Sequence, residues 1–148
     1  MTETHTLVIA YGNRLRGDDG VGPAAADIVA QWQLHGVKVR IVHQLTPELA
    51  DEMKSVERVL FVDAALSAGE CPFASRAVTP NKSRRPLAHH ETPASLLALL
   101  CELEGRAPQA WLLTISAYSF DHGAPLSAEA EDNLQAALAW MRAWVARC

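Results

Sequence analysis

The chain has 148 residues, of which 49% are hydrophobic and 20% are charged, and its formal net charge is −4. A chain of this length buries enough apolar surface to fold without disulfides or a structural metal, so we expect one domain over residues 1–148. The mild acidity argues against a nucleic-acid partner, because such binders rely on clustered Lys and Arg.

The cysteine pattern and the lack of long apolar runs bear on the compartment. Cys71, Cys101 and Cys148 are odd in number and form no C-x-x-C pair, which suits a reducing compartment. No apolar run approaches the roughly 20 residues that span a bilayer, and residues 7–11 are too short for the apolar core of a signal peptide. We therefore expect a cytoplasmic protein with no membrane partner.

The first part of the chain is predicted to form a strand, a turn and a helix. Residues 6–11 are a continuous hydrophobic run that stops at Gly12, as in a strand buried on both faces. Apolar residues recur at helical spacing over residues 21–32, and Pro23 falls in the first turn, where proline is tolerated.

The middle of the chain alternates in the same way and then becomes irregular. Residues 37–42 alternate apolar with basic side chains, which predicts a strand nearer the sheet edge, and a short helix is expected over residues 47–53. Residues 58–63 form a second buried strand that ends on an acid. Gly and Pro interrupt residues 64–88, which we interpret as an excursion from the sheet with one short strand near residues 75–78.

The last part returns to regular elements. A leucine-rich helix is predicted over residues 93–103, with Thr92 as its N-cap and Gly105 as its terminator. A strand follows at residues 110–115, and Ser127 opens the last helix. The whole pattern predicts a three-layer α/β/α sandwich around a mostly parallel, twisted sheet of about five strands.

The glycine-rich turn over residues 12–22 carries the densest chemical signal, because ligands bind at such turns in open α/β sheets. Gly12 and Gly17 have the spacing of two P-loop glycines, but Asp18 and Asp19 follow where that motif has Lys and Ser or Thr. Two carboxylates would repel a phosphate, which disfavours a nucleoside triphosphate site. A plain structural interpretation, in which the acids cap a helix, explains one Asp better than the pair.

Two further classes of site fit poorly. Gly20, Gly22 and Ala25 match a relaxed dinucleotide fingerprint only at a position displaced from the strand end, and the strand over residues 37–42 is followed by His43 and Gln44 rather than by an acid for a ribose. There is no G-x-S-x-G elbow, and neither Cys71 nor Cys101 has a local signature of an activated thiol.

A set of carboxylates and imidazoles remains. In a parallel sheet, Asp19 follows the first strand, Asp63 ends a later strand, and His89 and His90 precede the leucine-rich helix, so all can meet at the carboxyl edge. Two carboxylates and one imidazole suit zinc, nickel, manganese or iron, with open positions left. Taken singly, each residue has a plain explanation as a cap, a strand end or a loop histidine.

At these residues the sequence resembles the maturation endopeptidases of [NiFe] hydrogenases. Residues 12–22 match the family turn G-N-x-(L/M)-x-x-D-(D/E)-x-x-G without a gap, and residues 60–64 match its hydrophobic strand ending in D-A. Residues 90–93 fit its histidine just before a leucine-rich helix. Residues 44–49 and 110–115 are most similar to the subgroup that serves soluble, NAD-reducing hydrogenases.

The resemblance implies a site and a reaction. It implies that Asp19, Asp63 and His90 contact nickel and act in catalysis, and that Asp18 is the neighbouring family acid rather than a principal ligand. His89 competes for the third position, but His90 keeps the family's distance to the proline and glycine that follow.

The implied reaction removes a C-terminal extension from a nickel-loaded hydrogenase large-subunit precursor. The nickel is then carried by the substrate rather than permanently bound, and the enzyme is expected to act as a monomer. Either the nickel polarises the scissile carbonyl, or an enzyme carboxylate activates water as in an aspartyl-type endopeptidase. The alternatives are a non-catalytic nickel carrier or chaperone for hydrogenase assembly and, less compatible with the two acids, a nucleotide-binding module.

Overall fold

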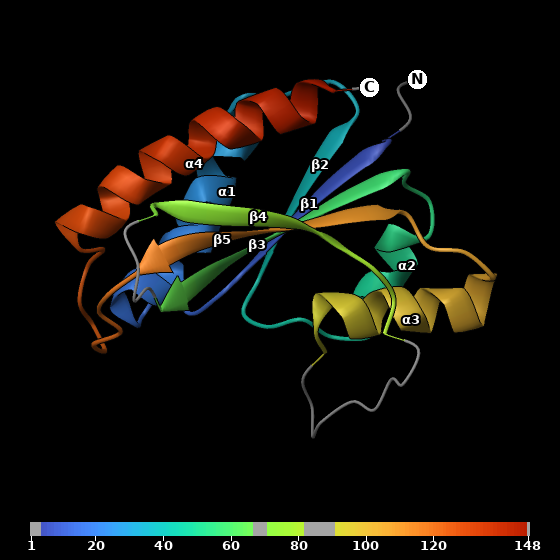
Figure 1. Cartoon of the computed structure of the whole chain (residues 1–148), viewed down its shortest axis with the longest axis horizontal. Helices are drawn as coiled ribbons and strands as arrows, with labels where there is room; N and C mark the ends of the chain where they lie inside the picture. The colour runs from blue at the N-terminus through green and yellow to red at the C-terminus, as the bar shows by residue number, and fades with distance from the viewer. Residues whose placement is uncertain (1–3, 67–70, 82–90, 148) are drawn as a thin grey trace.

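The fold is built on a single sheet of five strands. The structure is a computed structural model, and its description covers residues 4–66, 71–81 and 91–147. The strand order is β2-β1-β3-β5-β4. The strands are β1 (Thr6–Tyr11), β2 (Val37–Val42), β3 (Arg58–Leu66), β4 (Phe73–Val78) and β5 (Gln109–Ala117), as seen in Figure 1.

Four of the five strands run parallel, so their carboxyl ends meet at one edge of the sheet. β1 pairs in parallel with both β2 and β3, β3 pairs in parallel with β5, and only β4 runs antiparallel. The predicted, mostly parallel α/β/α sandwich is thereby confirmed. In the described part of the chain, no helix is long and apolar enough to cross a membrane.

Helices cover both faces of the sheet and give it two hydrophobic cores (Figure 1). The helices α1 (Val21–Gln31) and α4 (Ala128–Ala146) pack on one face, and α2 (Leu49–Met53) and α3 (Pro93–Glu104) pack on the other. Successive strand residues alternate between these cores, as the two-residue period of a strand requires. The strand side chains buried under α1 and α4 are those of Val8, Ala10, Leu60, Val62, Leu113 and Ile115. Those buried under α2 and α3 are Leu7, Ile9, Val59, Phe61, Val78, Ala110 and Leu112.

The predicted helix ends are confirmed by their capping contacts. The Thr92 side chain accepts a hydrogen bond from the Ser95 N–H at 3.1 Å, and the Ser95 hydroxyl accepts one from the Thr92 N–H at 2.7 Å, which closes a capping box at the start of α3. Gly105 ends α3 with φ of 75°, a left-handed conformation that favours glycine. The Ser127 hydroxyl caps α4 by accepting from the Ala130 N–H at 3.1 Å.

The short strand predicted near residues 75–78 is confirmed, but the prediction that the chain leaves the sheet after residue 63 is wrong in two respects. β3 continues to Leu66, and residues 73–78 form β4, which joins the sheet beside β5. Antiparallel pairing allows this, because the chain can turn back without a helical crossover. That β4 belongs to the sheet was hard to predict from the sequence, since residues 74–77 are all exposed in an edge strand and form no apolar run.

The central position of β5 makes its core residues critical for stability. Leu113 is fully buried on β5, whereas Leu103 on α3 is 64% exposed. We expect Leu113→Ala to lower the free energy of unfolding by about 2–5 kcal/mol, because it leaves a cavity between tightly packed layers. Leu103→Ala, the matched control, should change it by less than about 0.5 kcal/mol. Urea unfolding of both variants measures the difference, and equal losses would contradict the assigned core.

Candidate functional site

The turn after β1 places two adjacent acids at the carboxyl edge of the sheet. It leads into η1 (Gly17–Gly20), a short 3₁₀ helix that carries Asp18 and Asp19 directly before α1. Gly12 has φ of 150°, and a Cβ there would collide with the backbone carbonyl of Asp19. The turn therefore depends on glycine to fold back closely on the strand end.

Asp18 is fully buried and acts as a structural anchor. Its carboxylate accepts hydrogen bonds from the backbone N–H groups of Tyr118 at 2.9 Å, Ser119 at 3.1 Å and Ser127 at 2.7 Å, and from the Ser127 hydroxyl at 2.8 Å. Burial raises the pKa of Asp18, but these bonds together outweigh it and hold the pKa below its ordinary 3.8. Four donors use the acceptor capacity of the carboxylate, so Asp18 is poorly suited to bind a ligand.

Asp19 accepts its hydrogen bond from within the turn rather than from distant segments. The Asn13 N–H donates to one Asp19 oxygen at 2.7 Å, and the Asn13 side chain in turn accepts from the Leu15 N–H at 2.9 Å. The Asp19 side chain is only partly buried. One acid of the pair is thus buried within the fold, and the other reaches the surface of the edge.

Asp63 lies on β3 beside the end of β1 and faces the α2 and α3 side of the sheet. Ala10 pairs with Val62, so Tyr11 and Asp63 follow next to each other, and the Tyr11 hydroxyl donates a hydrogen bond to the Asp63 carboxyl. The Ala64 N–H donates a second bond at 2.8 Å.

The pKa of Asp63 is raised mainly by its burial. Burial raises this pKa to about 6, and the negative charge of Asp19 adds to the rise, while the bonds from Ala64 and Tyr11 oppose it. Burial and the Asp63 charge likewise raise the pKa of Tyr11. Asp19 and Asp63 thus lie within electrostatic reach of each other at this edge, and their joint role in one site stays a prediction.

The predicted imidazole, His90 or its competitor His89, lies outside the described residues. Glu91, the next residue in the sequence, donates its N–H to the Leu45 carbonyl at 3.4 Å, just beyond the carboxyl end of β2. In the ranges 4–66, 71–81 and 91–147, no three His, Cys, Asp or Glu side chains gather into a metal site. The ligand set Asp19, Asp63 and His90 stays a prediction.

Sequence reasoning missed Tyr11 as a member of the site. Its hydroxyl binds Asp63, yet in the sequence it appears only as the last residue of a buried strand. Tyr11 could have been found from the register of β1 and β3, which places it next to Asp63. That register can be used only once β1 and β3 are known to be neighbours. The donors to Asp18 were also missed, because they lie about 100 residues further along the chain.

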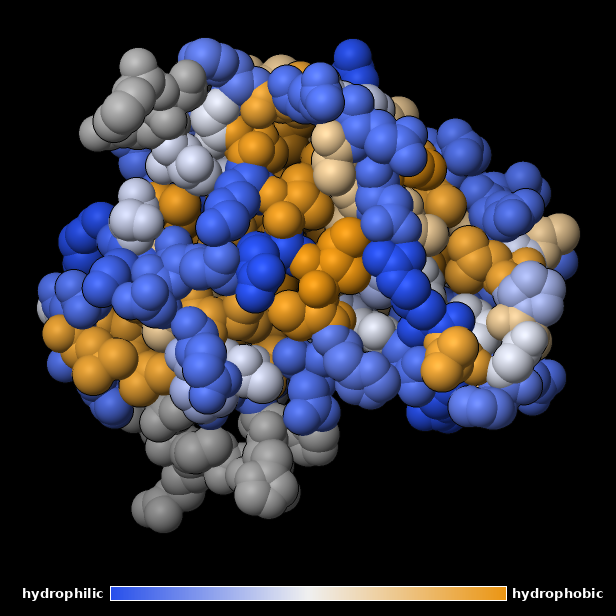
Figure 2. Space-filling view, turned by 180° about the vertical axis from the view of Figure 1, so that it is seen from behind, coloured by the Kyte–Doolittle hydropathy of each residue, from blue (hydrophilic) through white to orange (hydrophobic). Residues whose placement is uncertain are grey.

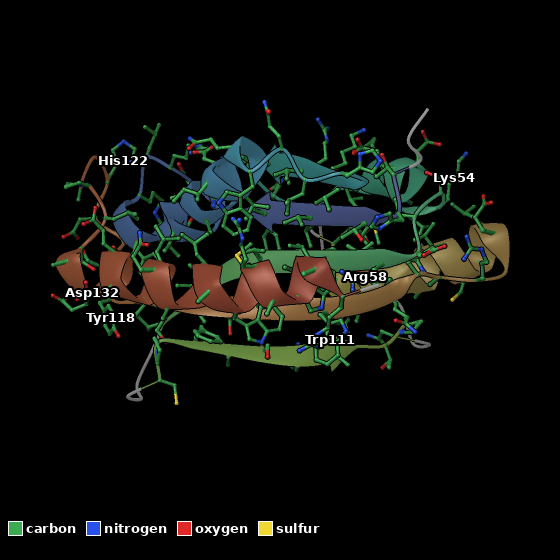
Figure 3. The ribbon with its side chains drawn as sticks, turned by 90° about the horizontal axis from the view of Figure 1, so that it is seen from above. Lys54, Arg58, Trp111, Tyr118, His122 and Asp132 are labelled. Carbon is green, nitrogen blue, oxygen red and sulfur yellow. The ribbon has the colours of Figure 1, made fainter. Side chains whose placement is uncertain are left out.

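Two cavities lie at opposite ends of the sheet. One of about 360 Å³ is lined by residues 12–15 and 41–43 beside Asp19, on the β2 side of the molecule, where Figure 2 shows hydrophobic side chains gathered between hydrophilic ones. Another, of about 540 Å³, is lined by Arg58, Trp111 and Trp144 among others, and lies at the far end from Tyr118 (Figure 3). The first adjoins the turn whose Asn13 N–H binds Asp19.

Comparison with known proteins gives a fold match rather than a sequence match. No family model and no curated protein matches the sequence. The structure is similar to the [NiFe] hydrogenase maturation protease HybD from Thermococcus kodakarensis, with 26% identity, a TM-score of 0.72, and 95% of this chain and 98% of that chain covered.

Two further solved structures agree. The hydrogenase maturating endopeptidase HybD from E. coli matches with 19% identity and a TM-score of 0.73, over 95% of this chain and 91% of that one. The hydrogenase 2 maturation peptidase from Thaumarchaeota archaeon SCGC_AB-539-E09 matches with 22% identity and a TM-score of 0.71, over 96% and 98%. The chain has the fold of the [NiFe] hydrogenase maturation proteases. The resemblance inferred from the sequence is confirmed, and the fold match supports endopeptidase activity. The subgroup stays a prediction.

The contrast between the two adjacent acids is testable. In Asp18→Asn, the side-chain NH₂ faces at least one backbone or hydroxyl donor, so we expect the free energy of unfolding to fall by about 2–4 kcal/mol. Asp19→Asn should cost less than about 1 kcal/mol, since its amide oxygen can still accept from Asn13. Urea unfolding at pH 7 measures both. An equal effect of the two substitutions would contradict the anchoring role of Asp18.

The raised pKa of Asp63 predicts a dependence of stability on pH. Native Asp63 holds its proton more tightly than the unfolded chain does, so stability falls as pH rises from about 4 to the native pKa of about 6. Asp63→Asn should remove this slope. Above pH 7 the Asp63→Asn variant should be more stable than the wild type by about 1–2 kcal/mol. This gain is smaller than the free energy equivalent to the whole pKa shift, because the side chain is partly exposed to solvent.

Urea unfolding between pH 4 and 8 checks this dependence, with Asp132→Asn, on an exposed residue of α4, as the control. Parallel pH profiles for the wild type and Asp63→Asn would show that Asp63 is not perturbed.

Proposed function

We propose that this protein is an endopeptidase that removes the C-terminal extension of a nickel-loaded [NiFe] hydrogenase large-subunit precursor. The observation that carries the proposal is the meeting of Asp19 and Asp63 at the carboxyl edge, in a fold similar to that of solved hydrogenase maturation proteases. Ligands bind at this edge in open α/β sheets.

The charge of the acid pair supports a metal-bearing substrate. Burial and the charge of Asp19 raise the pKa of Asp63, and a bound cation would offset this by stabilising the ionised carboxylate. In the proposal, the nickel arrives with the precursor, and Asp19, Asp63 and His90 complete its coordination. Carboxylate and imidazole ligands are compatible with nickel, and the protein needs no permanent metal.

Two ways of attacking the peptide bond are compatible with this arrangement. Nickel held by the substrate can polarise the scissile carbonyl. Alternatively, Asp63 can take a proton from the attacking water, and its pKa of about 6 lies in the range that suits a general base near neutral pH. The Tyr11 hydroxyl fixes the orientation of the Asp63 carboxyl in both cases.

The proposed cleavage reaction implies that the partner is the hydrogenase precursor. The protein would act as a cytoplasmic monomer on one precursor molecule, with no nucleic acid or membrane involved. A non-catalytic nickel carrier would use the same acids but would leave the precursor uncut, so cleavage separates the two functions.

Cleavage of the purified nickel-loaded precursor is the direct test. The wild-type chain should shift the large subunit to lower mass on a denaturing gel, and Asp19→Ala, Asp63→Ala and His90→Ala should each lower the rate by at least about 100-fold. His89→Ala should be milder. The exposed residues Asp132 and His122, which Figure 3 places at the same end of the molecule, provide Asp132→Ala and His122→Ala as matched controls.

The possible outcomes distinguish the alternatives. Full activity in the three site variants would refute the site, and inactivation by His89→Ala alone would assign the third position to His89. If the wild-type chain binds the nickel of the precursor but leaves the precursor uncut, the result would favour a carrier.

A further inference from the structure

Within the described part of the chain, β4 is an edge strand that pairs on one side only. Across the described residues, β4 pairs with β5 alone, and its other side has no neighbouring strand (Figures 1 and 3). Residues 74–77 are all exposed, and three of them, Ala74, Ser75 and Ala77, have short side chains. An edge of this kind can accept another strand.

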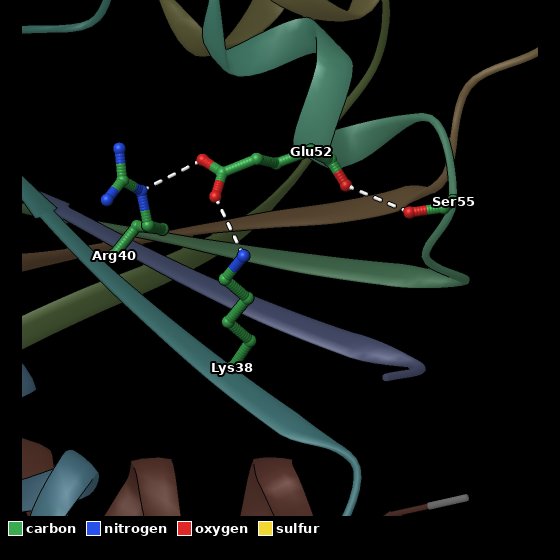
Figure 4. A network of polar contacts seen from close by, with 4 residues as sticks. All are labelled: Lys38, Arg40, Glu52 and Ser55. Atoms are coloured by element: carbon green, nitrogen blue, oxygen red, sulfur yellow. Dashed lines mark hydrogen bonds and ion pairs between the residues drawn. The ribbon is translucent and has the colours of Figure 1, made fainter. Parts of the chain in front are cut away.

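The opposite edge of the sheet, formed by β2, carries long charged side chains. On β2, Lys38 and Arg40 reach across to Glu52 of α2, each at 2.9 Å, as Figure 4 shows. Long charged side chains along an edge strand hinder pairing with another chain. The two edges therefore differ, and only the β4 edge combines small side chains with an exposed backbone.

The ladder between β4 and β5 determines which backbone groups face outward. The Ser116 N–H donates to the Pro72 carbonyl at 2.9 Å, which identifies this pair as hydrogen-bonded. Hydrogen-bonded pairs recur at every second residue of an antiparallel ladder. The N–H and C=O groups of Ser75 and Ala77 therefore point away from β5, toward the open side.

A small cavity adjoins this edge on the face that carries Asp63. It has a volume of about 150 Å³ and is lined by Ala74, Ser75, Arg76, Leu112 and Thr114. Arg76 forms no ion pair with any residue that the structure describes. Its charge opposes the rise that burial causes in the pKa of Tyr11, which places it within electrostatic reach of the site. The cavity thus offers a positive charge to a side chain that enters from the edge.

We propose that β4 binds the C-terminal extension of the precursor as a sixth strand, with an acidic group of that extension paired to Arg76. This inference rests on the proposed function. Backbone pairing supplies the affinity in this mode of peptide recognition, and the cavity supplies selectivity. The extension is the suitable occupant because it is to be removed and can extend freely, whereas the residues before the bond belong to the folded precursor.

The register gives the distance from the site. Asp63 pairs with Thr114, and Thr114 pairs with Ala74, so the three lie level across the sheet. An added strand lies three strand spacings from β3, or about 14 Å. At about 3.3 Å per residue, four or five residues bridge that gap. The segment paired with β4 therefore begins about four residues after the scissile bond.

Proline substitutions test the backbone pairing. Ser75→Pro and Ala77→Pro each remove one outward N–H without removing a ladder bond to β5, and edge strands tolerate proline at such positions. We expect KM for the precursor to rise about tenfold with kcat within about twofold of the wild type. Ser75→Ala and Ala77→Ser keep the N–H and serve as matched controls. Circular dichroism and urea unfolding confirm that each variant is folded.

A shortened substrate provides a second test of the proposed docking edge. A precursor with only three residues after the scissile bond cannot reach β4, so the proline variants and wild type should then have the same KM. Arg76→Ala should raise KM on the full precursor and have no effect on the shortened one, while Arg76→Lys should retain part of the affinity. A proline effect that persists on the shortened precursor would contradict the proposal.

Hydrogen exchange separates the failure of this inference from the failure of the proposed function. The amides of Ser75 and Ala77 should exchange fast in the free protein and become protected when the precursor binds. Protection without cleavage would refute the peptidase but support the docking edge. Cleavage without protection, or with unchanged KM in folded proline variants, would refute the edge alone. Protection that grows with protein concentration in the absence of precursor would assign the edge to a second copy of the chain and overturn the proposal.

Discussion

Four hydrogen bonds to the buried carboxylate of Asp18 hold the carboxyl edge of the sheet together. They join η1, which follows β1, to the segment after β5 and to the first residue before α4, elements separated by about 100 residues in the sequence. The Asp18 N–H adds a bond to the Ser119 carbonyl at 2.8 Å. A buried charge is costly unless it is fully paired, so this acid fixes the local backbone in a single arrangement. The position of Asp19, the next residue, depends on that arrangement.

The same edge keeps Asp19 and Asp63 close enough to disfavour their joint ionisation. The closeness is destabilising in the free protein, since burial and the neighbouring charge both raise the pKa of Asp63. It becomes favourable when a cation is brought to the pair. In the proposed function, that cation is the metal that the partner presents. The small cavity beside β4 lies on the face of the sheet that carries both Asp63 and Arg76.

Local patterns were enough to predict most of the fold. The apolar runs of β1, β3 and β5 and the caps of α3 and α4 are local signals, and the structure agrees with them. β4 was not assigned to the sheet, because an edge strand of small exposed residues lacks both an apolar run and an alternation. The parallel topology alone was enough to predict that Asp19 and Asp63 lie at the same edge of the sheet, which the structure bears out for their positions after β1 and near the end of β3. The role of Tyr11 and the donors to Asp18 could not be predicted, since they depend on strand order and on contacts between distant segments.

If this chain completes the coordination of a nickel ion held by the precursor, X-ray absorption at the nickel edge measures the added ligands directly. The spectrum is recorded on loaded precursor alone and after mixing with the inactive Asp19→Asn or Asp63→Asn chain. We expect an added oxygen or nitrogen ligand with each single variant, and none with a chain in which both acids and His90 are replaced by Ala. An unchanged nickel spectrum on mixing, with binding verified by co-purification, would contradict this coordination.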